Sequence, residues 1–88
     1  MRSSVSYSLK IKASAVKSLR RVPTAERLRL IEAIDRLATE PTAGGVLKGE
    51  FRGLRRLRVG RYRIVYEVDE GELTILVIRI GHRKDAYR

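Results

Sequence analysis

The sequence contains no cysteine. This absence excludes disulfide scaffolds, thiolate metal sites and cysteine nucleophiles. Long apolar runs are missing from the beginning of the chain, where residues 1–15 alternate polar and apolar side chains and predict neither a signal peptide nor a membrane span. Internal repeats and low-complexity linkers are absent too. We therefore expect one domain over residues 1–88, located in the cytoplasm.

Acidic residues are in the minority. Ten Asp and Glu stand against twenty Lys and Arg, the formal net charge is +10, and fifteen of the basic residues are Arg. A guanidinium binds phosphate through a planar fork and stacks on bases, whereas Lys acts as a hydrated point charge. The composition favours nucleic acid or an acidic protein as the partner, although high charge can also serve solubility alone.

The first half of the chain predicts one strand and two helices. Residues 7–12 alternate apolar and polar side chains, which is the period of a half-buried strand. Residues 16–22 have helical spacing and end at Pro23, because the residue before a proline avoids the helical region. Thr24 can cap a second helix that ends near Glu40. The apolar stripe of this helix consists of Leu28, Ile31, Ile34, Leu37 and Ala38.

The second half predicts three strands. After a Gly44-Gly45 loop, residues 54–59, 62–68 and 73–80 are rich in β-branched and aromatic residues and are separated by short turns. The last of these segments is almost continuously apolar, which suits the centre of a sheet. We therefore expect an α+β fold of order β-α-α-β-β-β, in which a helical hairpin packs on one face of an antiparallel sheet.

Alternation along these strands gathers arginines on the face away from the core. Side chains predicted to point to the core are Leu57, Val59, Tyr62, Ile64, Tyr66 and Val68. Those predicted on the opposite face are Arg56, Arg58, Arg61, Arg63, Val65 and Glu67. Like charges opposite one another destabilise a sheet, so folding gives no reason to collect them, whereas a polyanion would convert that cost into affinity. The alternative is a solvated face whose charges only prevent edge pairing and aggregation.

Three segments carry a pattern that extends over nearly the whole chain: Leu47-Lys48-Gly49, residues 57–66, and the ending from Gly81 to Tyr87. In this order and in a chain of this length they resemble the RelE-type toxins of the RelE/ParE toxin superfamily. The resemblance implies a RelE-like fold and a type II toxin that cleaves mRNA in the ribosomal A site by attack of the RNA 2′-hydroxyl. It also implies neutralisation by an acidic, RelB-like antitoxin.

The resemblance assigns residues to roles. Arg63 matches the arginine that holds the scissile phosphate, Arg83 the arginine that stabilises the transition state or leaving group, and Tyr87 the tyrosine that stacks on or deprotonates the substrate. Arg56 stands at a catalytic position where some members carry Lys. The residues expected to contact RNA are Lys48, Arg58, Arg61, His82 and Lys84.

One departure from the family concerns the general base. Leu54 and Arg56 stand where family members offer Lys, and Arg does not lose its proton in a protein. Proton transfer therefore falls to Tyr87, His82 or water. Tyr has an ordinary pKa near 10, so Tyr87 would need the surrounding arginines to favour its phenolate. His82 is the sole histidine, and a lone histidine more often contacts structure or substrate.

Neither a cofactor nor a metal is expected, because Glu67 and Asp69 lie at the end of a strand, where acidic residues serve the turn. Two other functions remain open. One is a ParE-like inhibitor of DNA gyrase with the same fold, against which Arg63, Arg83 and Tyr87 argue. The other is an RNA-binding or inactive member of the fold, for which the missing Lys argues.

Overall fold

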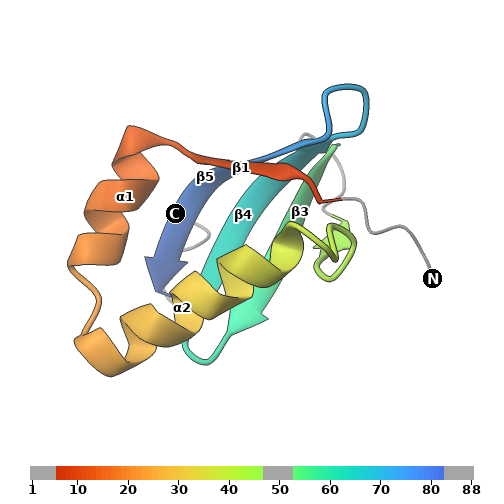
Figure 1. The fold of residues 1–88 in the computed structure, drawn as a ribbon. Coiled ribbons are helices and arrows are strands. Elements are labelled where there is room, and N and C mark those ends of the chain that lie inside the picture. The colour runs from red at the N-terminus through yellow and green to blue at the C-terminus, as the bar shows by residue number, and fades with distance from the viewer. Residues whose placement is uncertain (1–5, 47–52, 83–88) are drawn as a thin grey trace.

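The computed structural model describes residues 6–46 and 53–82, and they form two helices and one sheet (Figure 1). The helices are α1 (Ala13–Arg20) and α2 (Thr24–Leu37). The strands are β1 (Ser8–Ile11), β2 (Gly45–Val46), β3 (Leu54–Val59), β4 (Tyr62–Asp69) and β5 (Thr74–His82). Among these residues no helix is both long and apolar enough to cross a membrane.

The five strands are arranged in the order β1-β5-β4-β3-β2. β3, β4 and β5 form the antiparallel meander that the sequence predicts. β1 joins the far side of β5 in parallel, with Ser8 opposite Thr74 and Ile11 opposite Val77, so the sheet is mixed. A parallel neighbour requires a crossover connection, and the two helices supply part of it. β5 thereby lies inside the sheet, as its apolar sequence indicated.

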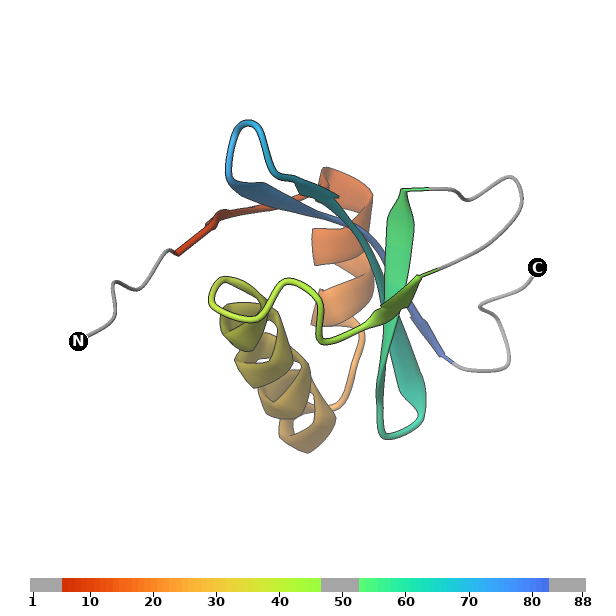
Figure 2. The same cartoon turned by 90° about the vertical axis from the view of Figure 1, so that its right-hand side faces the viewer.

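Both helices cover the same face of the sheet, and no described element covers the other face (Figure 2). Leu30, Ile34 and Leu37 of α2 share one helical stripe and are 0–4% exposed. They meet the inward side chains of the sheet, which are Ile64, Tyr66, Ile75, Val77 and Ile80. Ala15 and Val22 complete the buried set from α1 and the residues that follow it. This arrangement confirms the α+β fold predicted from the sequence.

The predicted stripe of α2 is wrong at two positions. Leu28 is 57% exposed and Ile31 is 40% exposed, whereas Leu30 is fully buried. Residues three apart advance only about 300° around a helix, so a series spaced by three slants across its surface. Leu30, Ile34 and Leu37 follow the 4-then-3 spacing that keeps one stripe on the core.

Several boundaries also differ from the sequence prediction. The first helix spans Ala13–Arg20 rather than residues 16–22, and the second ends at Leu37 rather than near Glu40. The N-cap of α2 is Pro23 rather than Thr24, and no side chain caps the helix. The Gly44-Gly45 segment was predicted as a loop, but Gly45 pairs with Arg56 in a two-residue strand. Leu73 lies in the turn before β5 with a φ of 53°, and β5 extends to His82 instead. The β3–β4 hairpin uses Gly60 with a φ of 59°, as the first central residue of a type II′ turn requires.

A pair of leucine variants tests this packing. We expect Leu30→Ala to lower the free energy of unfolding by about 2–5 kcal/mol, because it deletes a fully buried side chain. Leu28→Ala, in the same helix but exposed, should change it by no more than about 0.5 kcal/mol. Urea unfolding followed by circular dichroism measures both, and equal losses would contradict the orientation of α2.

Candidate functional site

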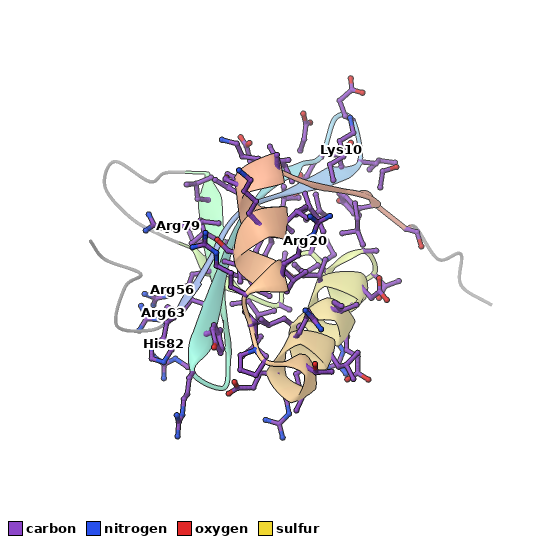
Figure 3. The ribbon with its side chains drawn as sticks, turned by 90° about the vertical axis from the view of Figure 1, so that its left-hand side faces the viewer. Lys10, Arg20, Arg56, Arg63, Arg79 and His82 are labelled. Atoms are coloured by element: carbon purple, nitrogen blue, oxygen red, sulfur yellow. The ribbon has the colours of Figure 1, made fainter. Side chains whose placement is uncertain are left out.

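The face of the sheet that the helices leave uncovered carries two rows of arginine. In one row Arg56 of β3 lies opposite Val65 of β4, which lies opposite Arg79 of β5. In the next row Arg58 lies opposite Arg63. Figure 3 shows Arg56, Arg63 and Arg79 on the side of the sheet away from α1 and α2. We call these four arginines (Arg56, Arg58, Arg63 and Arg79) the arginine face.

Arg63 is the buried member of the arginine face. It is 7% exposed, although alternation in the sequence predicted an open surface around it. It lies on a central strand, between Arg58 on one side and Gly81 on the other. A Cβ at Gly81 would meet nothing within 4 Å, so this glycine leaves space on the β5 side. Burial restricts the rotamers of Arg63, and a fixed guanidinium can present its planar fork to a phosphate in one orientation.

Arg79 is the member that sequence reasoning missed. Strict alternation from Ile75 and Val77, both fully buried, would place Arg79 in the core. A bulge between β4 and β5 prevents this, because Val65 lies opposite Arg79 while the next residue, Tyr66, lies opposite Val77. The extra residue turns Arg79 outward and brings Ile80 inward. A single arginine within an apolar strand was the signal in the sequence for such a bulge.

Leu54 and Arg56, where the resemblance leads one to expect Lys, also lie on the open face. Leu54, Arg56 and Arg58 alternate along β3 on one side, and Leu54 lies opposite Glu67 of β4. Leu54 brings no titratable group, and Arg56 cannot accept a proton. The described part of this face therefore presents cationic groups that suit an anion but offers no lysine for proton transfer.

His82 and Arg61 lie apart from the centre of the arginine face. His82 is opposite Tyr62, and the two rings meet edge to face with centroids 5.4 Å apart. Figure 3 shows His82 near Arg63, at the end of the sheet. Arg61 is exposed in the β3–β4 turn rather than within a strand. Both remain at the same end of the sheet as Arg63.

Four of the predicted site residues fall outside the described residues. They are Lys48, Arg83, Lys84 and Tyr87. Among the residues that are described, no three His, Cys, Asp or Glu side chains come together in a way that could hold a metal ion.

A buried tyrosine holds the loop before β2 against the back of this site. The Tyr66 hydroxyl donates to the carbonyl of Pro41 at 2.8 Å and accepts from the Gly44 N–H at 2.9 Å. Arg55 donates to the Gly44 carbonyl at 2.7 Å. Burial raises the pKa of Tyr66, so the hydroxyl keeps the proton that it donates. A Cβ at Gly44 would lie 2.7 Å from the Arg56 carbonyl oxygen, so only glycine fits there.

The fold and the arginine face define a class: a small α+β protein whose open sheet surface is built for anions. Comparison with known proteins identifies the family. The profile of the ParE toxin of type II toxin-antitoxin systems, parDE, matches residues 9–87. Toxin RelG of Mycobacterium tuberculosis is 31% identical over 84 residues, covering 93% of this chain and 97% of that protein.

Solved structures support the same family assignment. The toxin-antitoxin complex RelBE2 of Mycobacterium tuberculosis contains a chain with 29% identity and a TM-score of 0.83, covering 92% of this chain and 95% of that one. The archaeal RelE-RelB complex from Pyrococcus horikoshii gives 33% identity and a TM-score of 0.76, covering 92% and 99%. This chain belongs to the RelE/ParE superfamily of type II toxins and, within it, to the RelE family.

The tyrosine contact predicts a specific loss of stability. We expect Tyr66→Phe to lower the free energy of unfolding by about 1–3 kcal/mol, because the buried Gly44 N–H and the Pro41 carbonyl lose their partner. Amide hydrogen exchange should show faster exchange at Gly44. Tyr7→Phe, which removes the same hydroxyl from a half-buried ring, is the control. A Gly44 amide that stays as protected as in the wild type would refute the role of this hydroxyl.

Proposed function

We propose that this toxin is a ribosome-dependent mRNA endoribonuclease that cleaves mRNA in the ribosomal A site and so inhibits translation. The observation that carries the proposal is the arginine face, in which the nearly buried Arg63 lies between Arg58 and the side-chain-free Gly81. Burial holds the guanidinium of Arg63 in one orientation, in which its planar fork can meet a phosphate. The resemblance of the chain to RelE-type toxins names that anion as the scissile phosphate.

The proposed reaction needs no cofactor. The RNA 2′-oxygen attacks the adjacent phosphorus, the bond to the 5′-oxygen breaks, and the product ends in a 2′,3′-cyclic phosphate. Arg63 orients the phosphate, and Arg56 and Arg79 neutralise the charge that builds on its oxygens in the transition state. By resemblance, Arg83 stabilises the leaving oxygen. The 2′-hydroxyl proton must pass to a base, and a proton must reach the leaving 5′-oxygen.

The base is best assigned to Tyr87 or to water. Arg56 is excluded because a guanidinium does not lose its proton in a protein, and Leu54 has no group that could accept a proton. His82 is a third candidate, and its ring packs edge to face against that of Tyr62. Tyr87 keeps the role that the resemblance gives it. Lys48, Arg58, Arg61 and Lys84 would hold the RNA backbone by charge.

We also propose that an acidic, RelB-like antitoxin neutralises the toxin. Two of the structural relatives are complexes of a toxin with its antitoxin. A chain with a net charge of +10 attracts such a partner at long range, and the same arginines would then be withdrawn from RNA.

A ParE-like inhibitor of DNA gyrase is the second candidate. The observation in its favour is the match of residues 9–87 to the ParE toxin profile. In that case the arginine face would contact a protein and no RNA would be cut. The two candidates differ in a single measurable product, because only the ribonuclease leaves new RNA ends.

Primer extension on a reporter mRNA in a translating extract tests the proposal. Wild-type protein should produce cuts inside translated codons, and Arg63→Met should reduce their rate by roughly 10²- to 10³-fold, because a fixed charged donor is lost. Methionine keeps the apolar stem of Arg63 packed. Tyr87→Phe and Arg83→Ala should also reduce cleavage.

Arg20→Ala is the matched control, since Arg20 is an exposed arginine on α1 away from the arginine face (Figure 3). It should cleave at the wild-type rate within about two-fold, as expected of a surface charge outside the site. Intact mRNA together with inhibition of DNA gyrase supercoiling would replace this proposal by the ParE-like one.

A further inference from the structure

Two glycines lie within the described strands, Gly45 in β2 and Gly81 in β5. Glycine in a strand costs stability, because it loses more conformational freedom on folding than any other residue and has no side chain to pack. A glycine at such a position therefore needs a physical reason. The usual reasons are a backbone with positive φ, or a neighbouring atom so close that no side chain would fit.

Neither reason applies to Gly45 or Gly81. The described glycines with positive φ are Gly53 and Gly60, and both lie outside the strands. A Cβ at Gly44 would lie 2.7 Å from a carbonyl oxygen, whereas a Cβ at Gly45 or Gly81 would meet nothing within 4 Å. The fold itself would therefore accept alanine at both strand positions.

Both strand glycines lie beside the arginine face. In the register of the sheet, Gly45 is directly opposite Arg56 and Gly81 is directly opposite Arg63. Opposed residues of an antiparallel pair point to the same face, with Cβ atoms about 4.5–5.5 Å apart. A side chain at either glycine would therefore stand on the open face, next to one of the arginines.

The gap at Gly81 has the larger consequence because Arg63 is nearly buried. Across the sheet, Arg63 has Arg58 on its other side, and along β4 the next residue on the same face is Val65. Arg79 lies beside Val65 on β5. Of these four neighbours in the described sheet, Gly81 alone has no side chain. An anion can therefore approach the Arg63 guanidinium most closely from the side of Gly81.

We propose that Gly81 is a positioning residue for the proposed cleavage: the gap that it leaves beside Arg63 admits the sugar-phosphate backbone of a single RNA strand. Gly45 leaves a second such gap beside Arg56. The inference rests on the ribonuclease function proposed above and adds which positions must lack a side chain.

The chemistry of the gaps fits this occupant. A glycine within a strand often marks the close approach of a ligand. Gaps flanked by guanidinium groups suit a chain that carries a negative charge on every residue, as RNA does. Gly81 itself contributes no bond to the RNA. It lets the scissile phosphate reach a guanidinium that burial holds in one orientation.

Replacing Gly81 should move stability and cleavage in opposite directions. Gly81→Ala and Gly81→Val should leave the midpoint of thermal unfolding unchanged or raise it by up to about 6 °C, because the new side chain meets no atom and favours a strand. The same variants should slow mRNA cleavage, by roughly ten-fold for alanine and a hundred-fold for valine, because the phosphate is displaced from Arg63. Gly45→Val should slow cleavage by roughly ten-fold for the same reason at Arg56.

Gly71→Ala is the matched control. Gly71 lies in the turn between β4 and β5, at the end of the sheet far from Arg63, and a Cβ there would make only an ordinary contact of 3.4 Å with Asp69. This variant should cleave mRNA within about two-fold of the wild-type rate, as expected of a surface change outside the site.

A double variant tests whether Gly81 acts through Arg63. Arg63→Met alone should slow cleavage by roughly 10²- to 10³-fold. If the gap serves the approach to Arg63, adding Gly81→Val should slow this variant further by less than about three-fold. Two independent effects would multiply instead.

Binding of RNA is measured separately from cleavage. Fluorescence anisotropy at low salt follows the binding of a labelled single-stranded oligoribonucleotide to the full chain without ribosomes. Gly81→Val should weaken this binding by roughly five-fold or more, because the backbone no longer reaches Arg63, whereas Gly71→Ala should leave it unchanged.

Four outcomes would overturn the proposal. They are wild-type cleavage in both Gly81 variants, losses that multiply in the double variant, a lower midpoint of unfolding in Gly81→Ala, and weaker binding of a glutamate-rich peptide but not of the oligoribonucleotide, which would assign the gap to a protein partner. If the wild type binds the oligoribonucleotide but cuts no mRNA, the proposed ribonuclease fails, and the binding of Gly81→Val still decides whether RNA uses the gap.

Discussion

The two-sided character of β4 is the constraint on which the rest of the structure depends. Ile64 and Tyr66 are fully buried under the helices, while the residues before each of them, Arg63 and Val65, face the opposite way. Because the period of a strand is two, a slip of one residue would place the arginine in the core and the isoleucine outside. The buried stripe of α2 fixes this register, and with it the position of every arginine on the open face.

Sequence alone could predict most of this arrangement because the governing patterns are local. Alternation along β3 and β4 gives the two faces correctly, and Gly60 marks the hairpin between them. The same rule fails on β5, where a bulge moves Arg79 to the open face. A bulge depends on how two strands meet, so alternation misplaces Arg79, and only the presence of a lone arginine in an apolar strand points to the irregularity. The prediction of the buried stripe of α2 fails for a related reason. Leu28 and Leu30 are equally apolar, and only packing distinguishes the exposed one from the buried one.

The candidate site was predictable in its arginines but not in their environments. Arg56, Arg58 and Arg63 follow from alternation, whereas the near-complete burial of Arg63 depends on neighbours from two other strands. His82 is likewise placed by its partner Tyr62 across the sheet. The contact of Tyr66 with Pro41 and Gly44 joins residues more than twenty positions apart, and no short pattern in the sequence indicates it.

A face made of arginine separates binding from proton transfer. Guanidinium groups hold a phosphate and stabilise added charge at any pH at which the protein is folded, but they cannot take up a proton. A lysine at the position of Leu54 or Arg56 could combine both tasks on one strand. For the proposed cleavage, the sheet of this chain would supply the electrostatic part, and the base would come from another segment or from water. The outer face can accept acidic groups of either kind, so under the proposed function RNA and an acidic partner would compete for the same arginines.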